Sequence, residues 1–457
     1  MNQGKRHKES KSGRRIQTRQ GSVHQGLVHP HAAGIDVGAT EIYVAAPPAG
    51  EEQEVRCYKT FTEDLHRLGD WVQERGVDTV AMESTGVYWI PLFQILEARG
   101  IEVCLVNARH VKNVTGRKSD VQDCQWLQHL HSVGLLAASF RPEQEICALR
   151  TVLRHRAEVV QDASGHIQHM QKSLDQMNLQ LHHVISELAG MTGLAILDAI
   201  LAGERDRYQL AGLRDARIRA SEETIVKSLV GDYRPEHLFT LRQALEAYRF
   251  CQKQLAACDD QIRRMLQEMD SFEGGDGGSP APWANDAFDL KSELHRVLGV
   301  DLTQVPGLEV KTAQVLLSEV GVNLAKSFRS AEAFVSWLGL CPDNRVSGGK
   351  VLSAHIRKVH NRVANALRGA ARSLHHSDSP LGAYYRRMRA KLGAPKAIVA
   401  TAHKLARIIY HMLTSRQAYD PSVFDEMERK RVEYVKAKLQ AHARALGMRL
   451  VPAEAAC

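Results

Sequence analysis

Four acidic residues occupy positions from which their carboxylates could share a divalent cation: Asp36, Glu83, Asp120 and Asp123. Asp36 lies inside one apolar run, and Glu83 ends another. A carboxylate inside or at the end of a β-run is costly to desolvate unless another charge compensates it. Asp120 and Asp123 stand three residues apart at the start of a helical stretch, so they share a helix face with Cβ atoms about 5–6 Å apart.

Carboxylate oxygens are the ligands that hard ions such as Mg²⁺ and Mn²⁺ prefer, and these ions keep coordination positions open for phosphate. Two such ions about 3.5–4 Å apart can stabilise the attacking and leaving oxygens of a phosphoryl transfer. The four acids therefore predict a Mg²⁺ or Mn²⁺ site for phosphodiester chemistry on nucleic acid. For Asp120 and Asp123 alone, an acidic first helical turn capped by Ser119 is an equally good interpretation.

A serine in a glycine-rich segment offers a second kind of chemistry. Ser347 precedes Gly348 and Gly349, whose lack of side chains allows the backbone to approach a ligand closely, and Arg345 and Lys350 flank it. A serine hydroxyl is a weak nucleophile, so it would need a metal ion or a base to activate it. Judged from these residues alone, a turn or capping serine is the commoner use of such a position.

Basic and aromatic side chains surround both candidate sites. Cations hold phosphates and aromatic rings stack on bases, so these residues are expected to contact nucleic acid. Trp89 is better interpreted as a core or helix-start residue. The expected contacts are Tyr88, Arg109, Lys112, Arg117, Lys118, Lys311, Arg345, Lys350, Arg357, Lys358, Arg362 and Arg368.

Positive charge is concentrated in two segments of the chain, whose formal net charge is +8. Residues 1–20 hold seven Lys and Arg against one Glu, and residues 350–416 hold fourteen against the single acid Asp378. Such segregation produces a local field suited to a polyanion, because each neutralised phosphate releases condensed counterions. Ordinary solvated helix faces are the alternative interpretation.

The elements that must position the four acids follow an α/β order. Three β-like runs come first, and β and α segments then alternate up to about residue 141, which predicts a mixed sheet with the strand order of a ribonuclease-H-like domain. The expected strands are 34–37, 42–45, 54–61, 79–82 and 103–106, and the expected helices are 65–75, 89–99 and 120–133.

The rest of the chain is expected to be mostly helical. Apolar residues recur at three- and four-residue spacing between residues 144 and 270, which predicts two long helices joined by smaller ones, as an antiparallel hairpin or a coiled-coil dimer seam. A Pro-Gly turn at 305–313 predicts a helix-hairpin-helix-like element. The expected parts are a disordered basic arm (1–26), a catalytic α/β domain (27–143), a helical region (144–272), a flexible linker (273–287), a domain carrying Ser347 (288–416) and a charged helical tail (417–457).

The cysteine pattern and the distribution of apolar residues indicate where in the cell the protein is expected. The eight cysteines are scattered without a Cys-x-x-Cys pair, so buried free thiols are expected rather than a zinc site or a disulfide framework. No stretch of about 18 apolar residues exists, and the polar N-terminus lacks a signal-peptide core. We therefore expect a cytoplasmic protein, associated with the nucleoid when active, with no membrane partner.

The motifs at residues 34–38, 83–86, 118–123 and 347–350 together resemble the IS110 family of bacterial insertion-sequence transposases, and the likeness spans roughly residues 30–415. In that family a RuvC-like domain supplies a D-E-D-D set of acids, which the resemblance places on Asp36, Glu83, Asp120 and Asp123. A separate transposase domain supplies a serine. Many members carry tandem serines before the two glycines, whereas here the first is Val346, which leaves Ser347 for that role.

The resemblance also implies an activity and partners. It implies a DNA recombinase in which a serine attacks a phosphodiester and forms a phosphoserine link, while metal ions stabilise the displaced oxygen. It further implies a structured noncoding guide RNA that pairs with donor and target DNA. The helical middle would mediate a homodimer, and two dimers would form a tetramer around two DNAs, with acids and serine contributed by different protomers.

Three other functions remain open from the residues. Asp36-Val37-Gly38-Ala39-Thr40 is similar to the first phosphate loop of actin-like sugar kinases, although no second phosphate loop follows. A plain RuvC-like nuclease or resolvase would use the acids without serine chemistry. A coiled-coil protein that binds nucleic acid without catalysis would leave the four acids without a purpose.

Overall fold

The fold is taken from a computed structural model, which describes residues 26–48, 53–84, 86–107, 119–271, 288–357 and 359–449. The chain divides into two compact units, Met1–Arg141 and Pro142–Cys457. The expected linker at 273–287 and residues 1–25 of the expected basic arm lie outside the described residues.

The first unit contains a five-stranded mixed sheet with the order β3-β2-β1-β4-β5. Strands β1, β2 and β3 pair antiparallel as successive neighbours, whereas β4 and β5 run parallel to β1. The expected α/β layout with a mixed sheet is confirmed. The strands are β1 (Ala32–Val37), β2 (Glu41–Ala45), β3 (Val55–Lys59), β4 (Thr79–Glu83) and β5 (Glu102–Val106).

Helices cover both faces of this sheet. Helices α1 (Thr62–Glu74) and α2 (Trp89–Ala98) pack on the face that presents Ile35 and Met82, where the main apolar core of the unit lies. Helix α4 (Asp120–Ser132) contributes Leu127 to a smaller cluster on the opposite face, together with Ala81. Side chains alternate between the two faces along a strand, so Ala32, Gly34 and Asp36 all point toward α4.

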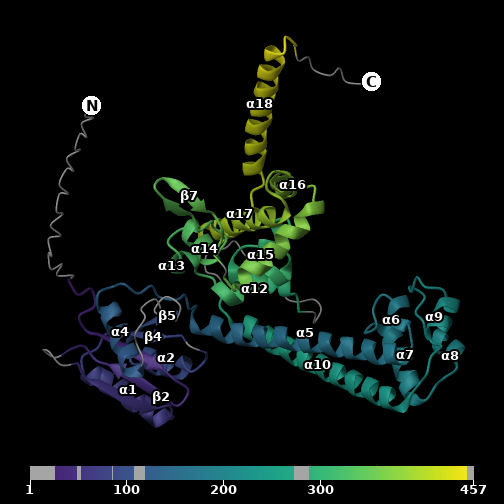
Figure 1. Ribbon diagram of the computed structural model, residues 1–457, viewed down its shortest axis with the longest axis horizontal. Coiled ribbons are helices and arrows are strands. Elements are labelled where there is room, and N and C mark those ends of the chain that lie inside the picture. The colour runs from purple at the N-terminus through teal and green to yellow at the C-terminus, as the bar shows by residue number, and fades with distance from the viewer. Residues whose placement is uncertain are drawn as a thin grey trace, which may run out of the picture. The chain divides into compact units, whose positions relative to one another are not determined.

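The second unit begins with two long helices, α5 (Gln144–Gln176) and α10 (Pro235–Glu268), which lie side by side in Figure 1. Arg156 Nε donates to Asp259 Oδ1 at 2.5 Å, and the hydroxyls of Ser173 and Thr240 lie 3.1 Å apart. As the residue number rises along α5, the number of the contacting residue on α10 falls, so the two helices run antiparallel. Of the two arrangements left open by the sequence, the structure shows the hairpin within one chain.

Four short helices close this hairpin around a separate apolar core. They are α6 (Leu181–Val184), α7 (Met191–Ala202), α8 (Arg207–Gly212) and α9 (Glu222–Ser228). The apolar repeat from Leu174 to Leu188 does not form one helix, because Asn178 takes a left-handed conformation with φ of 55° just after α5 ends. Asparagine is one of the few side chains that tolerate this region.

The described remainder of the second unit is mostly helical, as predicted, and includes a small hairpin of strands. Its Pro-Gly turn separates α11 from α12, and Gly307 there has φ of 88°. The elements are α11 (Leu290–Leu298), η1 (Leu302–Gln304), α12 (Val310–Val320), α13 (Leu324–Ser327), α14 (Ala331–Trp337), β6 (Arg345–Ser347), β7 (Lys350–Ser353), α15 (Arg362–Ser373), η2 (Leu374–His376), α16 (Pro380–Leu392), α17 (Ala394–Ser415) and α18 (Ser422–Ala445).

An ion-pair network attaches α5 to α12 within this unit. Arg154 donates to both carboxylate oxygens of the buried Glu319, from Nε at 3.0 Å and from Nη2 at 2.7 Å. Arg150 donates to the backbone carbonyls of Ser318 and Glu319 at 3.1 and 2.8 Å. These bonds satisfy carbonyls at the C-terminal end of α12, which would otherwise lack helical partners.

The cysteines of the described residues are all free thiols, as expected. Their burial varies: Cys124, Cys251 and Cys258 are buried, but Cys57 is exposed, so the expectation of buried thiols is wrong at Cys57. None of the helices described is both long and apolar enough to cross a membrane.

Candidate carboxylate site and serine hairpin

The approach of α4 to β1 depends on Gly34. A Cβ atom at this position would overlap the backbone of Cys124 and Gln128, so only glycine lets the helix lie this close to the strand. Gln128 Nε2 also donates to the carbonyl of Ala32 at 3.2 Å, which fixes the helix along the strand. The first turn of α4 therefore lies toward the Asp36 end of β1.

Asp36 and Glu83 occupy neighbouring parallel strands. The strand register pairs Ile35 with Met82, and Asp36 and Glu83 each follow these residues by one position. Both acids consequently lie at the carboxyl ends of their strands, on the face that α4 covers. Each side chain is partly buried.

Asp120 and Asp123 both lie in the first turn of α4, as predicted. Ser119 is the N-cap and accepts a hydrogen bond from the backbone N–H of Gln122 at 3.4 Å. Asp120 is exposed, whereas Asp123 is partly buried. The capping interpretation is thus confirmed for Ser119, but it accounts for the helix start and not for the proximity of these acids to the sheet.

The pKa of Asp36 reflects the charges of the other three acids. The pKa of the Asp36 carboxyl is raised from 3.8 to about 6, chiefly by burial and then by the negative charges of Glu83, Asp120 and Asp123 in that order, against one backbone hydrogen bond that lowers it. A carboxylate responds in this way when like charges lie near it in a poorly solvated place. The four acids therefore share one negative field.

The four carboxylates influence one another electrostatically without forming a tight cluster of three. Among the described residues, no three of these acids have their oxygens within 4.8 Å of one another. Carboxylates without a cation repel each other, so a spread arrangement is the expected result. Four carboxylates around the partly buried Asp36 fit a hard divalent cation such as Mg²⁺ or Mn²⁺.

Sequence reasoning missed two residues beneath this site. Cys124 lies one turn after Asp120, and burial together with the charge of Asp36 raises the pKa of its thiol to about 12. The thiol therefore stays protonated and is no ligand for a hard ion. Gly34 is the other omission. Its place two residues before Asp36, on the same face of a strand, is the signal that could have revealed it.

Ser347 lies at the end of β6 in a tight β-hairpin. It pairs with Lys350 across Gly348 and Gly349, whose φ angles are 55° and 75°. Two successive positive φ angles are typical of the type I′ turns that join short hairpins, and they require residues such as glycine. The expected loop is thus a two-stranded hairpin, and Ser347 is exposed on it.

The expected nucleic-acid contacts have different environments. Tyr88 is 49% exposed, and Lys311, Lys350 and Arg362 are exposed. Arg357 donates to the carbonyl of Ser336 and Arg368 donates to Asn365, so both already have partners within the chain. Arg109, Lys112, Arg117, Lys118, Lys358 and the side chain of Arg345 lie outside what the structure describes.

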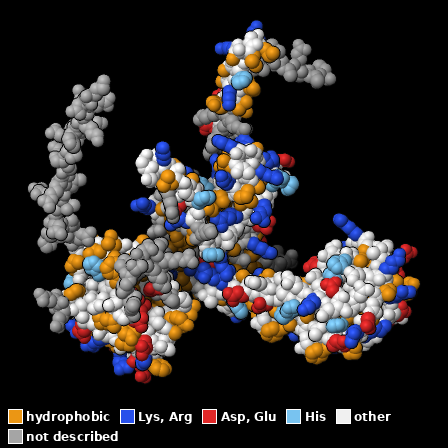
Figure 2. All heavy atoms as spheres, in the orientation of Figure 1, with side chains coloured by type: hydrophobic (Ala, Val, Ile, Leu, Met, Phe, Trp, Pro, Cys, Tyr) orange, Lys and Arg blue, Asp and Glu red, His pale blue; other side chains and the backbone are white. Residues whose placement is uncertain are grey.

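Trp89 is structural, as interpreted from the sequence. Its indole N–H donates to the carbonyl of Gly86 at 3.2 Å, and its ring meets Phe93 edge-on at 5.7 Å between centroids. Lys and Arg gather over the α15 to α17 part of the second unit in Figure 2. Some of these cations are engaged within the fold, since Arg386 donates to Ser377 and Arg407 pairs with Glu332.

Comparison with known proteins gives a consistent family. Residues 33–179 match the DEDD IS110 family, described as a transposase, and residues 301–386 match a family described as transposase IS116/IS110/IS902. A protein of Sinorhizobium fredii named as a transposase, y4pF/y4sB, is 24% identical over 230 residues, which are 48% of this chain and 57% of that protein. The 43.6 kDa protein of insertion element IS110 from Streptomyces coelicolor is 31% identical over 121 residues, 26% of this chain and 29% of that protein.

These alignments cover less than two thirds of either relative. The two family matches nevertheless fall on the two candidate sites, since the first contains all four acids and the second contains Ser347. The carboxylate cluster, the serine hairpin and both matches agree, and the chain belongs to the IS110 family of insertion-sequence transposases.

Proposed function

We propose that this protein is the DNA transposase of a bacterial insertion sequence, which cuts and rejoins DNA with a serine nucleophile and a D-E-D-D metal site on a ribonuclease-H-like, RuvC-like domain. The observation that carries the proposal is the shared field of Asp36, Glu83, Asp120 and Asp123, which comes from residues on two strands and a helix. Structural proteins rarely gather four acids at one partly buried place without a cation to hold.

The metal ligands in this proposal are the four carboxylates. Asp36 and Glu83 would hold Mg²⁺ or Mn²⁺ from the ends of β1 and β4, and Asp120 and Asp123 would hold it from the first turn of α4. The ion would supply positive charge to a phosphate oxygen and lower the barrier to its displacement. The close packing at Gly34 keeps the helical and strand ligands at a fixed separation.

Ser347 is the proposed nucleophile. Its Oγ forms a bond to a DNA phosphorus, and the bond from that phosphorus to one sugar oxygen breaks. The serine hydroxyl proton is released, and the displaced sugar oxygen becomes a hydroxyl when it takes up a proton. The phosphoserine bond keeps the phosphoester available for rejoining to a second DNA end. The exposed hairpin end offers Ser347 to DNA without another element of the described residues covering it.

The proposed partners are donor and target DNA and a structured noncoding guide RNA made from the element itself. The basic segment at residues 350–416 supports polyanion binding, because its Lys and Arg outnumber its acids fourteen to one. We further propose a homodimer formed through the helical middle as a coiled coil, a tetramer on two DNAs, and a composite site with acids and serine from different protomers.

The test is capture of the covalent intermediate. The full chain is incubated with guide RNA, Mg²⁺ and end-labelled DNA, denatured, and examined for label bound to protein. The proposal predicts label on the unaltered chain and on Ser353→Ala, a serine of the same hairpin, but none on Ser347→Ala. Equal labelling of all three chains would refute the role of Ser347.

A second candidate function is a metal-dependent nuclease without serine chemistry. One observation favours this function. All four acids belong to the first unit, whereas the hairpin that carries Ser347 belongs to the second. In this alternative Ser347→Ala would still cut DNA with unchanged rate, and no protein-bound label would form. Family membership leaves the sugar kinase alternative without support.

A further inference from the structure

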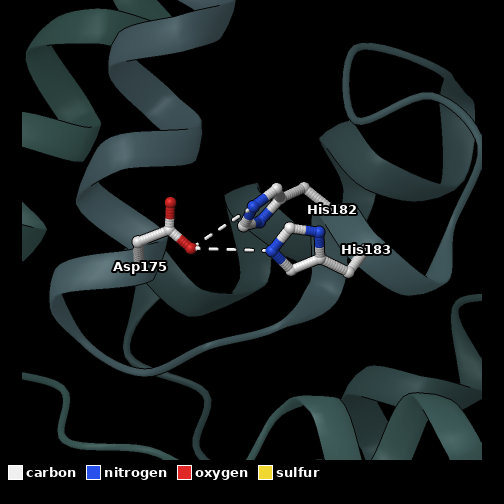
Figure 3. Close-up of side chains that lie close together, drawn as sticks. All are labelled: Asp175, His182 and His183. Carbon is white, nitrogen blue, oxygen red and sulfur yellow. Dashed lines mark ion pairs between the residues drawn. The ribbon is translucent and has the colours of Figure 1, made fainter.

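Three side chains converge at the far end of the helical hairpin, away from both proposed catalytic groups in the sequence. Asp175 lies at the end of α5, and His182 and His183 lie on the single-turn helix α6 (Figure 3). Asp175 Oδ1 is 3.3 Å from His182 Nε2 and 3.9 Å from His183 Nε2. Among the described residues, this is the one group of three His, Cys, Asp or Glu side chains whose donor atoms all lie within 4.8 Å.

The backbone around this cluster is held in place by the core. The left-handed Asn178 reverses the chain after α5, and the N–H of Gln180 donates to the carbonyl of Ser228 at 2.8 Å. Leu181 and Ile185 flank the histidines and are 0% and 4% exposed. The positions of the two histidines relative to Asp175 are therefore set by buried neighbours rather than by the cluster itself.

The orientation of the two histidines is unusual for adjacent helical residues. Consecutive side chains on a helix do not normally face each other. Here the rings lie 4.0 Å apart between centroids, tilted by 42°, and both direct Nε2 toward one carboxylate oxygen. The His182 side chain is 7% exposed, whereas those of Asp175 and His183 are 52% and 64% exposed, so the cluster opens to solvent on one side.

The separations suit a tetrahedral transition-metal site. With metal–nitrogen and metal–oxygen bonds of about 2.0–2.2 Å, two ligand atoms on one tetrahedral ion lie roughly 3.3–3.5 Å apart. The Asp175 to His182 distance of 3.3 Å already meets this value, and the 3.9 Å distance to the more exposed His183 needs only a small side-chain shift. The C-terminal end of α5 adds the negative end of a helix dipole, which favours a cation.

We propose that Asp175, His182 and His183 form a binding site for a divalent transition metal of the zinc class, with solvent as the fourth ligand. Two imidazole nitrogens and one carboxylate oxygen are ligands that Zn²⁺ commonly binds. The site of four carboxylates suits Mg²⁺ or Mn²⁺ instead. Bound metal joins the end of α5 to α6 and strengthens the tip of the hairpin. This site is independent of the proposed transposase chemistry.

The experiment uses the untagged full chain carrying Asp36→Asn, which weakens the carboxylate site. Zn²⁺ is titrated against a chromophoric chelator, and the ligands of the bound ion are identified by X-ray absorption. His183→Ala and Asp175→Asn remove exposed ligands with little risk to folding. His155→Ala, an exposed histidine on α5, is the matched control. Unchanged circular dichroism without metal verifies that each variant is folded.

The proposal predicts one zinc equivalent with two imidazole ligands in the Asp36→Asn background and in the His155→Ala control. Each ligand substitution should weaken that equivalent by more than about tenfold. Zinc should also raise the melting temperature of the Asp36→Asn chain, but not that of the same chain carrying His183→Ala. Failure to bind zinc, binding through oxygen ligands alone, or unchanged affinity in His183→Ala would each overturn the proposal.

Discussion

Asp36 and Glu83 lie next to each other at the carboxyl ends of the parallel strands β1 and β4, and the charge of Glu83 is the largest electrostatic influence on Asp36 after burial. Two partly buried carboxylates in this relation destabilise each other when both are ionised. A divalent cation would remove that repulsion. The pair therefore links the stability of the first unit to pH and to metal.

The first prediction concerns Asp36→Asn in the absence of divalent metal. The folded-state pKa of Asp36 is raised from 3.8 to about 6, so this group lowers stability progressively as pH rises from about 4 to 6. The variant lacks that charge and should melt at a higher temperature than the parent at pH 8, with the difference shrinking toward pH 4. Calorimetry at both pH values measures this.

Metal should reverse the order of the two proteins. Saturating Mn²⁺ is expected to raise the melting temperature of the parent more than that of Asp36→Asn, because the parent binds the ion more tightly. A variant that is less stable than its parent in metal-free buffer at pH 8 would contradict the raised pKa.

The second prediction concerns the close contact between β1 and α4. Gly34→Ala places a methyl group against the backbone of Cys124 and Gln128, so the helix must move away from the strand. We expect a loss of about 1–3 kcal/mol of stability, the usual cost of overpacking, and weaker Mn²⁺ binding. Chemical denaturation and metal titration measure the two effects.

Gly165→Ala in α5 is the matched control for this change, because nothing lies within 4 Å of the added methyl group. It should stabilise the helix by roughly 0.5–1 kcal/mol and leave metal binding unchanged. If Gly34→Ala behaved like this control, the close approach of α4 would have no role in placing the acids.

Much of the first unit could be predicted from the sequence, because short apolar runs of period two alternate there with amphipathic helical stretches. The strands around Asp36 and Glu83 and the helix beginning at Asp120 follow directly from those patterns. The end of α5 could not be predicted from the apolar pattern. The apolar repeat continues through it, and only the left-handed conformation of Asn178 shows that the helix ends.

The third prediction concerns the joint between α5 and α12. Arg154→Met removes the bidentate ion pair of the buried Glu319, although Arg150 Nε stays 3.4 Å from the carboxylate. Removing one partner of a buried charged group should cost roughly 1–3 kcal/mol, reduced here by the partial exposure of Arg154. Urea denaturation of the full chain measures it.

Arg156→Met on the same helix is the control for this joint. Arg156 pairs with Asp259, whose side chain is far more exposed than that of Glu319, so its removal should cost less than about 1 kcal/mol. Equal losses in the two variants would show that burial of Glu319 does not strengthen the joint.

The fourth prediction concerns acid stability. His131 is buried, contacts the Thr79 hydroxyl at 2.9 Å, and has a pKa lowered from 6.5 to about 4, chiefly by burial and then by the neighbouring His29. Its neutral ring contributes stability above pH 6.5 that is lost as pH falls toward 4. His131→Gln should therefore flatten the fall in stability over this range.

The comparison is made as a difference between parent and variant, so the opposite contribution of Asp36 cancels. His129→Gln, on the exposed face of the same helix, should keep the parent's pH dependence. A fall in the stability of His131→Gln as steep as that of the parent would contradict the assignment to His131.

The candidate sites were only partly predictable. The residue types of the four acids suggested a metal, but their convergence depends on strand order and on the contact at Gly34, which periodicity does not reveal. The Asp175 cluster was missed because its members are seven and eight residues apart across a helix break. The two glycines after Ser347 did signal a tight turn, since both need positive φ angles.

The proposed function rests on one divalent metal site held by Asp36, Glu83, Asp120 and Asp123. Its most direct test is Mn²⁺ binding followed by electron paramagnetic resonance, comparing the parent with an Asp36→Asn, Glu83→Gln double variant and with a Glu97→Gln control on the exposed side of α2. We expect the parent and the control to bind Mn²⁺ tightly, and the double variant to lose that binding. Mn²⁺ bound equally well by all three proteins would contradict it.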